Sequence, residues 1–168
     1  MPTLLWSDDF ALGVTEMDAT HQEFVALLAD ASRAADADLP TCWQALVEHT
    51  AQHFAREDAY MLATRFAATN CHTTHHAMVL NVMRQGLAMG QQGDLAPMRQ
   101  MARELATWFP QHADTMDAAL ALHLQRVGFD PATGAVTHAS ALPAEAIHGC
   151  GGGSCSPAEE PQPAAAAA

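Results

Sequence analysis

The sequence is poor in basic residues, in aromatic residues and in long apolar runs. Lysine and arginine total 7 residues against 19 aspartates and glutamates, which gives a formal net charge of −12 over 168 residues. An acidic surface is repelled by nucleic-acid phosphates and by anionic lipid headgroups, so neither is an expected partner. No stretch of about 18 apolar residues occurs, so no membrane-spanning helix is expected.

Cysteines are also few, and a targeting signal is not evident. The four cysteines are scattered and do not form the framework of a disulfide-rich secreted domain: Cys42, Cys71, Cys150 and Cys155. Residues 1–9 lack the basic n-region of a signal peptide. These features predict a cytoplasmic protein.

The residues that are abundant favour helices. Apolar residues make up 49% of the chain and aromatics only 6%, and a mixture dominated by alanine, leucine and methionine is typical of helices rather than strands. Apolar residues recur at helical spacing in four segments separated by breakers, with Asp18 and Thr41 as expected N-caps. We predict an all-α, up-down-up-down four-helix bundle, with helices over residues 18–35, 41–66, 71–89 and 95–127.

The expected bundle forms one domain over residues 1–128, preceded by a non-helical N-terminal arm over residues 1–17 that packs its apolar side chains on the body. Gly128 is expected to end the last helix. Residues 129–168 have no sustained apolar period, so this segment is predicted to be a disordered C-terminal tail. Its Cys150 and Cys155 could bind a soft metal or form a redox pair, but a solvated tail without a specific function is the simpler interpretation.

Metal-competent side chains recur one helical turn apart in two of the expected helices. His53 with Glu57, and His72 with His76, each stand at i and i+4, so both members of a pair project from one face of the helix. The other two helices add His21, and His112 with Asp117. A lone histidine on an apolar face is more often a hydrogen-bonded core residue than a ligand. Here all four helices offer at least one imidazole to the same interior, where such groups would otherwise lack partners.

The residue types indicate the kind of metal. Imidazole with carboxylate suits iron or zinc, whereas magnesium and calcium prefer oxygen ligands alone. No cysteine joins the set, which argues against an iron–sulfur cluster or a structural zinc site. Five imidazoles and two carboxylates exceed what one ion needs and suit two ions.

Two positions leave alternatives. His75 stands at i+3 from His72 and competes with His76, while His49 continues the stripe of His53 and is interpreted as a supporting or surface residue. Asp117 lies five residues after His112, about 140° around a regular helix. A local widening of the helix, favoured by Pro110, would bring both side chains inward.

At these positions the chain resembles the bacterial hemerythrins, non-haem di-iron proteins that bind oxygen. The resemblance covers about residues 6–127. It rests on Trp6-Ser7-Asp8, Leu12-Gly13-Val14, Met17-Asp18-Ala19-Thr20-His21, His53-Phe54-Ala55-Arg56-Glu57 with Met61, His72 and His76, Trp108 before His112, and Asp117.

The resemblance implies a role for each of these ligands. His72, His76 and His112 would hold one iron, and His21 and His53 the other. Glu57 and Asp117 would bridge the two ions together with a solvent-derived oxo or hydroxo group. The iron with only two histidines would keep one open place, where dioxygen would bind reversibly by taking an electron from each ferrous ion.

Five residues are expected to line the dioxygen pocket, although ordinary bundle core is an equally good interpretation of each one alone. Ala113 stands where the family commonly has a larger aliphatic residue, which implies a roomier pocket and faster autoxidation. The five residues are Phe24, Leu28, Met61, Trp108 and Ala113.

The resemblance therefore implies a binding protein and not an enzyme. Since no output domain is evident in the sequence, an oxygen carrier, store or delivery protein is favoured over a sensor, with transient delivery to oxygen-consuming enzymes. The alternatives are a di-iron enzyme that turns over dioxygen, peroxide or nitric oxide, and an iron donor.

Overall fold

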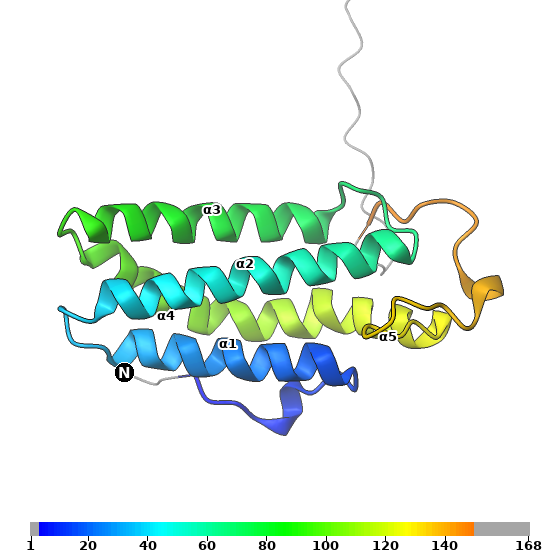
Figure 1. Cartoon of the computed structure of the whole chain (residues 1–168), viewed down its shortest axis with the longest axis horizontal. Coiled ribbons are helices and arrows are strands. Elements are labelled where there is room, and N and C mark those ends of the chain that lie inside the picture. The colour runs from blue at the N-terminus through cyan, green and yellow to red at the C-terminus, as the bar shows by residue number, and fades with distance from the viewer. Residues whose placement is uncertain (1–3, 150–168) are drawn as a thin grey trace, which may run out of the picture.

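The computed structural model describes residues 4–149 and confirms the four-helix bundle (Figure 1). Neighbours in the chain pack side by side, and the first helix also packs against the fourth, which closes the bundle. The fourth rod is built from three consecutive segments, two α-helices with a π-helical stretch between them. The elements are α1 (Thr15–Arg33), α2 (Leu39–Ala63), α3 (Cys71–Gln91), α4 (Ala96–His112), the π-helical segment (Ala113–Asp117) and α5 (Ala118–Val127).

Two helix starts differ from the sequence prediction. Helix α1 begins at Thr15, and Asp18 is not its N-cap, because its carboxylate accepts the backbone N–H groups of Leu12 at 2.7 Å and Gly13 at 3.1 Å. The carboxylate thus anchors the arm instead of capping the helix. Helix α2 begins at Leu39 with Pro40 in its first turn, where a missing N–H costs nothing. It ends at Ala63, a few residues before the predicted end.

The start of α3 agrees with the prediction and has a clear local cause. Asn70 forms a capping box with Thr73: its side chain accepts the N–H of Thr73 at 3.0 Å, and the Thr73 hydroxyl accepts the N–H of Asn70 at 3.0 Å. Two N–H groups that the helix itself cannot satisfy are therefore paired. This cap fixes the phase of α3, and with it the direction in which its histidines project.

The predicted widening of the last helix is present as the π-helical segment Ala113–Asp117, which begins three residues after Pro110. The extra residue per turn removes the angular mismatch between His112 and Asp117. Gly128 ends α5 in the left-handed conformation, with φ 61° and ψ 45°, as expected.

The apolar core divides into two clusters along the bundle. The larger cluster includes Phe24, Trp43 and Met83, and the smaller one includes Met17, Met61 and Leu120. On α1 and α2, the buried polar residues fall between the contributions to the two clusters. The bundle therefore holds a polar layer between two apolar ends.

The N-terminal arm packs on the bundle as predicted. Trp6 contacts Phe10 edge-on at 5.9 Å between ring centroids, and Phe10 contacts Phe109 of α4 at 6.3 Å. A short 3-10 helix, Asp8–Phe10, positions Phe10 for this contact. The arm thereby covers α4 at Phe109, three residues before His112.

Part of the predicted tail follows a defined path. Residues 129–149 leave α5, form a 3-10 turn at Ala139–Ala141 and reach the α2–α3 loop, where the backbone of Ile147 exchanges hydrogen bonds with Arg65 and Ala67 (Figure 1). Phe129 and Ile147 pack on the smaller apolar cluster. These two apolar side chains hold residues 129–149 against the bundle although the segment has no regular apolar spacing. The segment predicted to be disordered from residue 129 is therefore ordered as far as residue 149. Residues 150–168, with Cys150 and Cys155, lie outside the described residues.

Within residues 4–149, no helix is both long enough and apolar enough to cross a membrane.

Candidate metal centre

All seven side chains selected from the sequence converge in the polar layer between the two apolar clusters. Each is buried, with 0% exposure at His21 and Asp117 and at most 3% at the others. Helix α1 supplies one residue, α2 and α3 two each, and α4 with the π-helical segment the last two. The seven are His21, His53, Glu57, His72, His76, His112 and Asp117.

The side chains form two groups in which potential ligand atoms lie within 4.8 Å of one another. One group contains three imidazoles and the other contains two, and Glu57 belongs to both. Asp117 belongs to the three-imidazole group and its second oxygen faces His21 of the other group. The three-imidazole group is His72, His76 and His112, and the two-imidazole group is His21 and His53.

Each carboxylate presents one oxygen to each group. Glu57 Oε1 lies 3.1 Å from His53 Nε2 and 3.6 Å from His21 Nε2, while Oε2 lies 3.3 Å from His76 Nε2 and 3.8 Å from His72 Nε2. Asp117 Oδ2 lies 3.3 Å from His21 Nε2, and Oδ1 lies 3.0 Å from His72 Nε2 and 3.1 Å from His112 Nε2. Such a split is the arrangement that two bridging carboxylates require.

The polar atoms of this layer are poorly satisfied by the protein alone. Among the described residues, eight buried side-chain nitrogen and oxygen atoms have no hydrogen-bond partner, and all eight belong to six of these seven residues, His76 being the exception. The Nε2 atoms of His76 and His112 face each other at 3.3 Å. Unpaired polar groups at this depth are costly, whereas cations in their midst would satisfy them. The donor set therefore fits a pair of metal ions.

Carboxylates and imidazoles shift one another's pKa strongly. Burial lowers the pKa of His21, but the nearby carboxylates of Asp117 and Glu57 outweigh it and raise the pKa to about 9. His76 behaves likewise: burial opposes protonation, and Asp58 and Glu57 raise its pKa to about 9. The pKa of Glu57 and that of Asp117 lie well below their usual range, since burial raises them less than the surrounding imidazoles lower them. In the metal-free protein, protonated imidazoles thus offset the negative charges of Glu57 and Asp117.

Metal binding is expected to release these protons. At pH 7 both His21 and His76 carry a proton in the metal-free protein because their pKa values are about 9, and each must lose it to offer its ring nitrogen. Zinc binding at pH 7 should release about two protons per chain, and the release should disappear as the pH rises above about 9. Titration calorimetry in two buffers of different ionisation enthalpy measures the number. Release that stays constant up to pH 10 would contradict the assignment.

The other histidines and carboxylates near these positions in the sequence lie outside both groups. His75 is half-buried and Asp114 is exposed, and neither belongs to a metal-competent group among the described residues. His49 instead packs against α1, where its Nε2 lies 3.1 Å from the carbonyl of Thr20.

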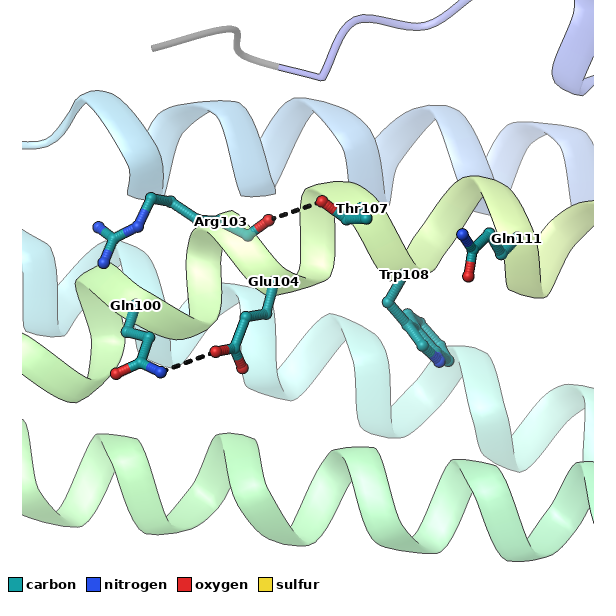
Figure 2. Close-up of a pocket in the computed structure, with 6 residues that line it drawn as sticks. All are labelled: Gln100, Arg103, Glu104, Thr107, Trp108 and Gln111. Carbon is teal, nitrogen blue, oxygen red and sulfur yellow. Dashed lines mark hydrogen bonds between the residues drawn. The ribbon is translucent and has the colours of Figure 1, made fainter.

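The five predicted pocket residues occupy different surroundings. Phe24, Leu28 and Ala113 are buried in the larger cluster, with Phe24 centred 6.4 Å from His53, while Met61 lies in the smaller cluster. Trp108 stacks on His112 at 4.4 Å between ring centroids. Figure 2 shows its ring pointing from α4 toward α2 and α3, and the ring lines both a hollow with the polar Glu104 and Gln111 and one with the apolar Val79 and Leu105. A role in a dioxygen pocket stays a prediction for all five.

Three residues that touch the site were not singled out from the sequence. Phe54 stacks on His76 at 3.9 Å with an interplanar angle of 3°, and Phe109 meets His21 edge-on at 5.3 Å. The Asp58 carboxylate lies 2.8 Å from His76 Nδ1. Phe54 and Asp58 stand four residues apart and therefore share one face of α2, the face that contacts His76 of α3. This spacing could have identified both from the sequence.

Comparison with known proteins agrees with this geometry. Residues 12–122 match the Hemerythrin HHE cation binding domain. The chain belongs to the hemerythrin family. A curated bacteriohemerythrin from Ralstonia nicotianae is 37% identical over 130 residues, which cover 77% of this chain and 95% of that protein. No solved structure matches the chain. The matched residues of this hemerythrin-family chain include all seven side chains of the polar layer.

Proposed function

We propose that this hemerythrin-family protein binds dioxygen reversibly at a centre of two iron ions. The observation that carries the proposal is the split of both carboxylates between a group of three imidazoles and a group of two. Both Glu57 and Asp117 have one oxygen facing each group, so the layer is suited to two neighbouring ions with shared oxygen ligands.

The proposed ligands follow from the two groups. One ion would be held by the three-imidazole group, His72, His76 and His112, and the other by His21 and His53. Glu57 and Asp117 would be shared between the two ions, which would also hold a solvent-derived oxo or hydroxo group. When bound in the ferrous state, the two ions would supply the electrons that dioxygen takes up on binding and returns on release.

The two sides of the proposed centre differ because one group has three imidazoles and the other has two. The side of His21 and His53 offers one nitrogen fewer, so dioxygen would bind on that side. Phe24 and Phe109 stack on each other at 4.8 Å beside these two histidines, and both are buried. A dry, apolar wall on this side would favour reversible binding because it would keep water and protons away from dioxygen.

The same donor set argues for binding over turnover. Ferritin-like di-iron oxidases use carboxylate-rich sets built on Glu-x-x-His, whereas this layer has five imidazoles and two carboxylates. We therefore favour an oxygen carrier, store or delivery protein that transfers its cargo transiently to oxygen-consuming enzymes. A di-iron enzyme and an iron donor are the competing functions.

An optical titration tests the proposal. Protein loaded with iron and reduced without air is expected to be nearly colourless, to gain charge-transfer bands in the visible on exposure to air, and to lose them when oxygen is removed. Iron analysis of the same sample should give about two ions per chain, as the two ligand groups require.

Other outcomes would reject a carrier. Immediate conversion to a ferric form that deoxygenation does not reverse would favour an enzyme, and loss of iron to a weak chelator during the cycle would favour an iron donor. Zinc-loaded protein serves as the control, because zinc has no redox chemistry and should show no band under air.

A further inference from the structure

The outward-facing nitrogens of the ligand imidazoles differ from one another. A histidine that binds metal through Nε2 ordinarily donates its Nδ1–H to a second group, which fixes the ring and its tautomer. The Nδ1 atoms of His21, His53 and His112 are buried without a hydrogen-bond partner among the described residues. His76 Nδ1, by contrast, lies 2.8 Å from Asp58 Oδ1.

Asp58 reaches His76 from a different helix. It follows Glu57 on α2, whereas His76 is on α3, so the contact joins the two helices beside the polar layer. The Asp58 side chain is 41% exposed and the His76 side chain 2%. The carboxylate can therefore keep its charge in contact with water while one oxygen accepts the imidazole N–H.

A second contact on the same face of α2 completes the clamp. Phe54, one turn before Asp58, lies parallel to the His76 ring at 3.9 Å with an interplanar angle of 3°. Phe54 therefore holds the plane of the ring, and Asp58 fixes its rotation within that plane. Together they leave Nε2 directed at Glu57 Oε2, 3.3 Å away.

We infer that Asp58 is a positioning residue that fixes the Nδ1–H tautomer of His76 and strengthens Nε2 as a metal donor. A carboxylate that accepts the Nδ1–H pushes electron density into the imidazole and raises the basicity of its other nitrogen. The inference rests on the proposed metal centre but not on its reaction with dioxygen. It places a negative charge behind a ligand of the three-imidazole group, whereas within residues 4–149 the Nδ1 atoms of His21 and His53 have no hydrogen-bond partner.

Three variants separate this role from a general effect of charge. Asp58→Ala removes the carboxylate, and alanine keeps α2 helical. Asp58→Glu restores a carboxylate that is one methylene longer. Asp114→Ala is the matched control: it removes an exposed negative charge two residues after His112, from a side chain that shares no metal-competent group among the described residues.

Zinc affinity, measured by competition with a chelator, is the first measurement and requires neither iron nor dioxygen. Asp58→Ala is expected to weaken binding about 10- to 100-fold, the usual cost of losing such a partner. Asp58→Glu should recover most of the affinity, and Asp114→Ala should match the unmodified protein. Equal affinities in Asp58→Ala and Asp114→Ala would overturn the inference.

The reduction potential of the iron-loaded protein is the second measurement, and a purely structural contact would leave it unchanged. Removing the carboxylate makes His76 a poorer donor to ferric iron, so the potential in Asp58→Ala should rise above those of Asp58→Glu and Asp114→Ala. A potential equal to that of Asp114→Ala would overturn the inference. If instead the unmodified protein fails to bind dioxygen while the zinc affinities follow the expected order, the proposed function fails and the role of Asp58 stands.

Discussion

Glu57→Gln is expected to abolish the two-ion centre while leaving the bundle folded. Glu57 is the one residue common to both metal-competent groups, and its two oxygens face His53 on one side and His76 on the other. Glutamine has almost the same shape but only one oxygen and no charge, so it cannot bridge two cations. We expect zinc affinity to fall by more than about 100-fold, beyond the loss typical for a residue that only supports a ligand.

The measurement is metal content together with chelator competition, on protein whose helical content is first checked by circular dichroism. Glu48→Gln is the matched control, because Glu48 is an exposed residue of the same helix whose carboxylate accepts a hydrogen bond from Gln44. That variant should hold as much metal as the unmodified protein. Two tightly held ions in Glu57→Gln would contradict the assignment of Glu57 as a bridge.

The ligand layer could be predicted from the sequence because its spacing obeys regular helix geometry. His53 with Glu57, and His72 with His76, stand four residues apart, and their convergence needs only four helices that face one interior. Asp117 was harder, since five residues do not fit a regular turn. It required a widened helix, which the structure contains as Ala113–Asp117.

Contacts that depend on tertiary packing were beyond the sequence. Asp18 looked like an N-cap because aspartate favours that position, but its carboxylate instead binds the N–H groups of the arm at Leu12 and Gly13. Asp58 has an ordinary place on α2, and its importance depends on the rotation of α3 that Asn70 and Thr73 set. Ile147 lies in a segment whose apolar residues follow no regular period, so no periodicity could reveal it as an anchor.

Trp43→Ala is expected to destabilise the metal-free protein by about 3–5 kcal/mol, as is usual when a large buried aromatic side chain is removed from a core. Trp43 is fully buried in the larger apolar cluster, and its Nε1–H donates to the Met83 carbonyl at 3.0 Å. Both the apolar contacts of α2 with its neighbours and a hydrogen bond to α3 would be lost. Urea unfolding of the metal-free protein at pH 7 measures the effect.

Metal affinity of the folded variant should nevertheless remain unchanged. Trp43 precedes His53 by ten residues, so the two lie about 15 Å apart along the axis of α2. Trp43→Phe is the graded control: it keeps most of the apolar volume, loses the hydrogen bond and part of the ring contacts, and should cost about 1–3 kcal/mol. Because ions bind the folded state alone, saturating zinc should raise the stability of both variants and the unmodified protein by the same amount. A smaller rise in Trp43→Ala would mean that the larger apolar cluster and the polar layer are energetically coupled. An equal rise would establish that this cluster stabilises the bundle while the seven polar side chains bind the metal independently.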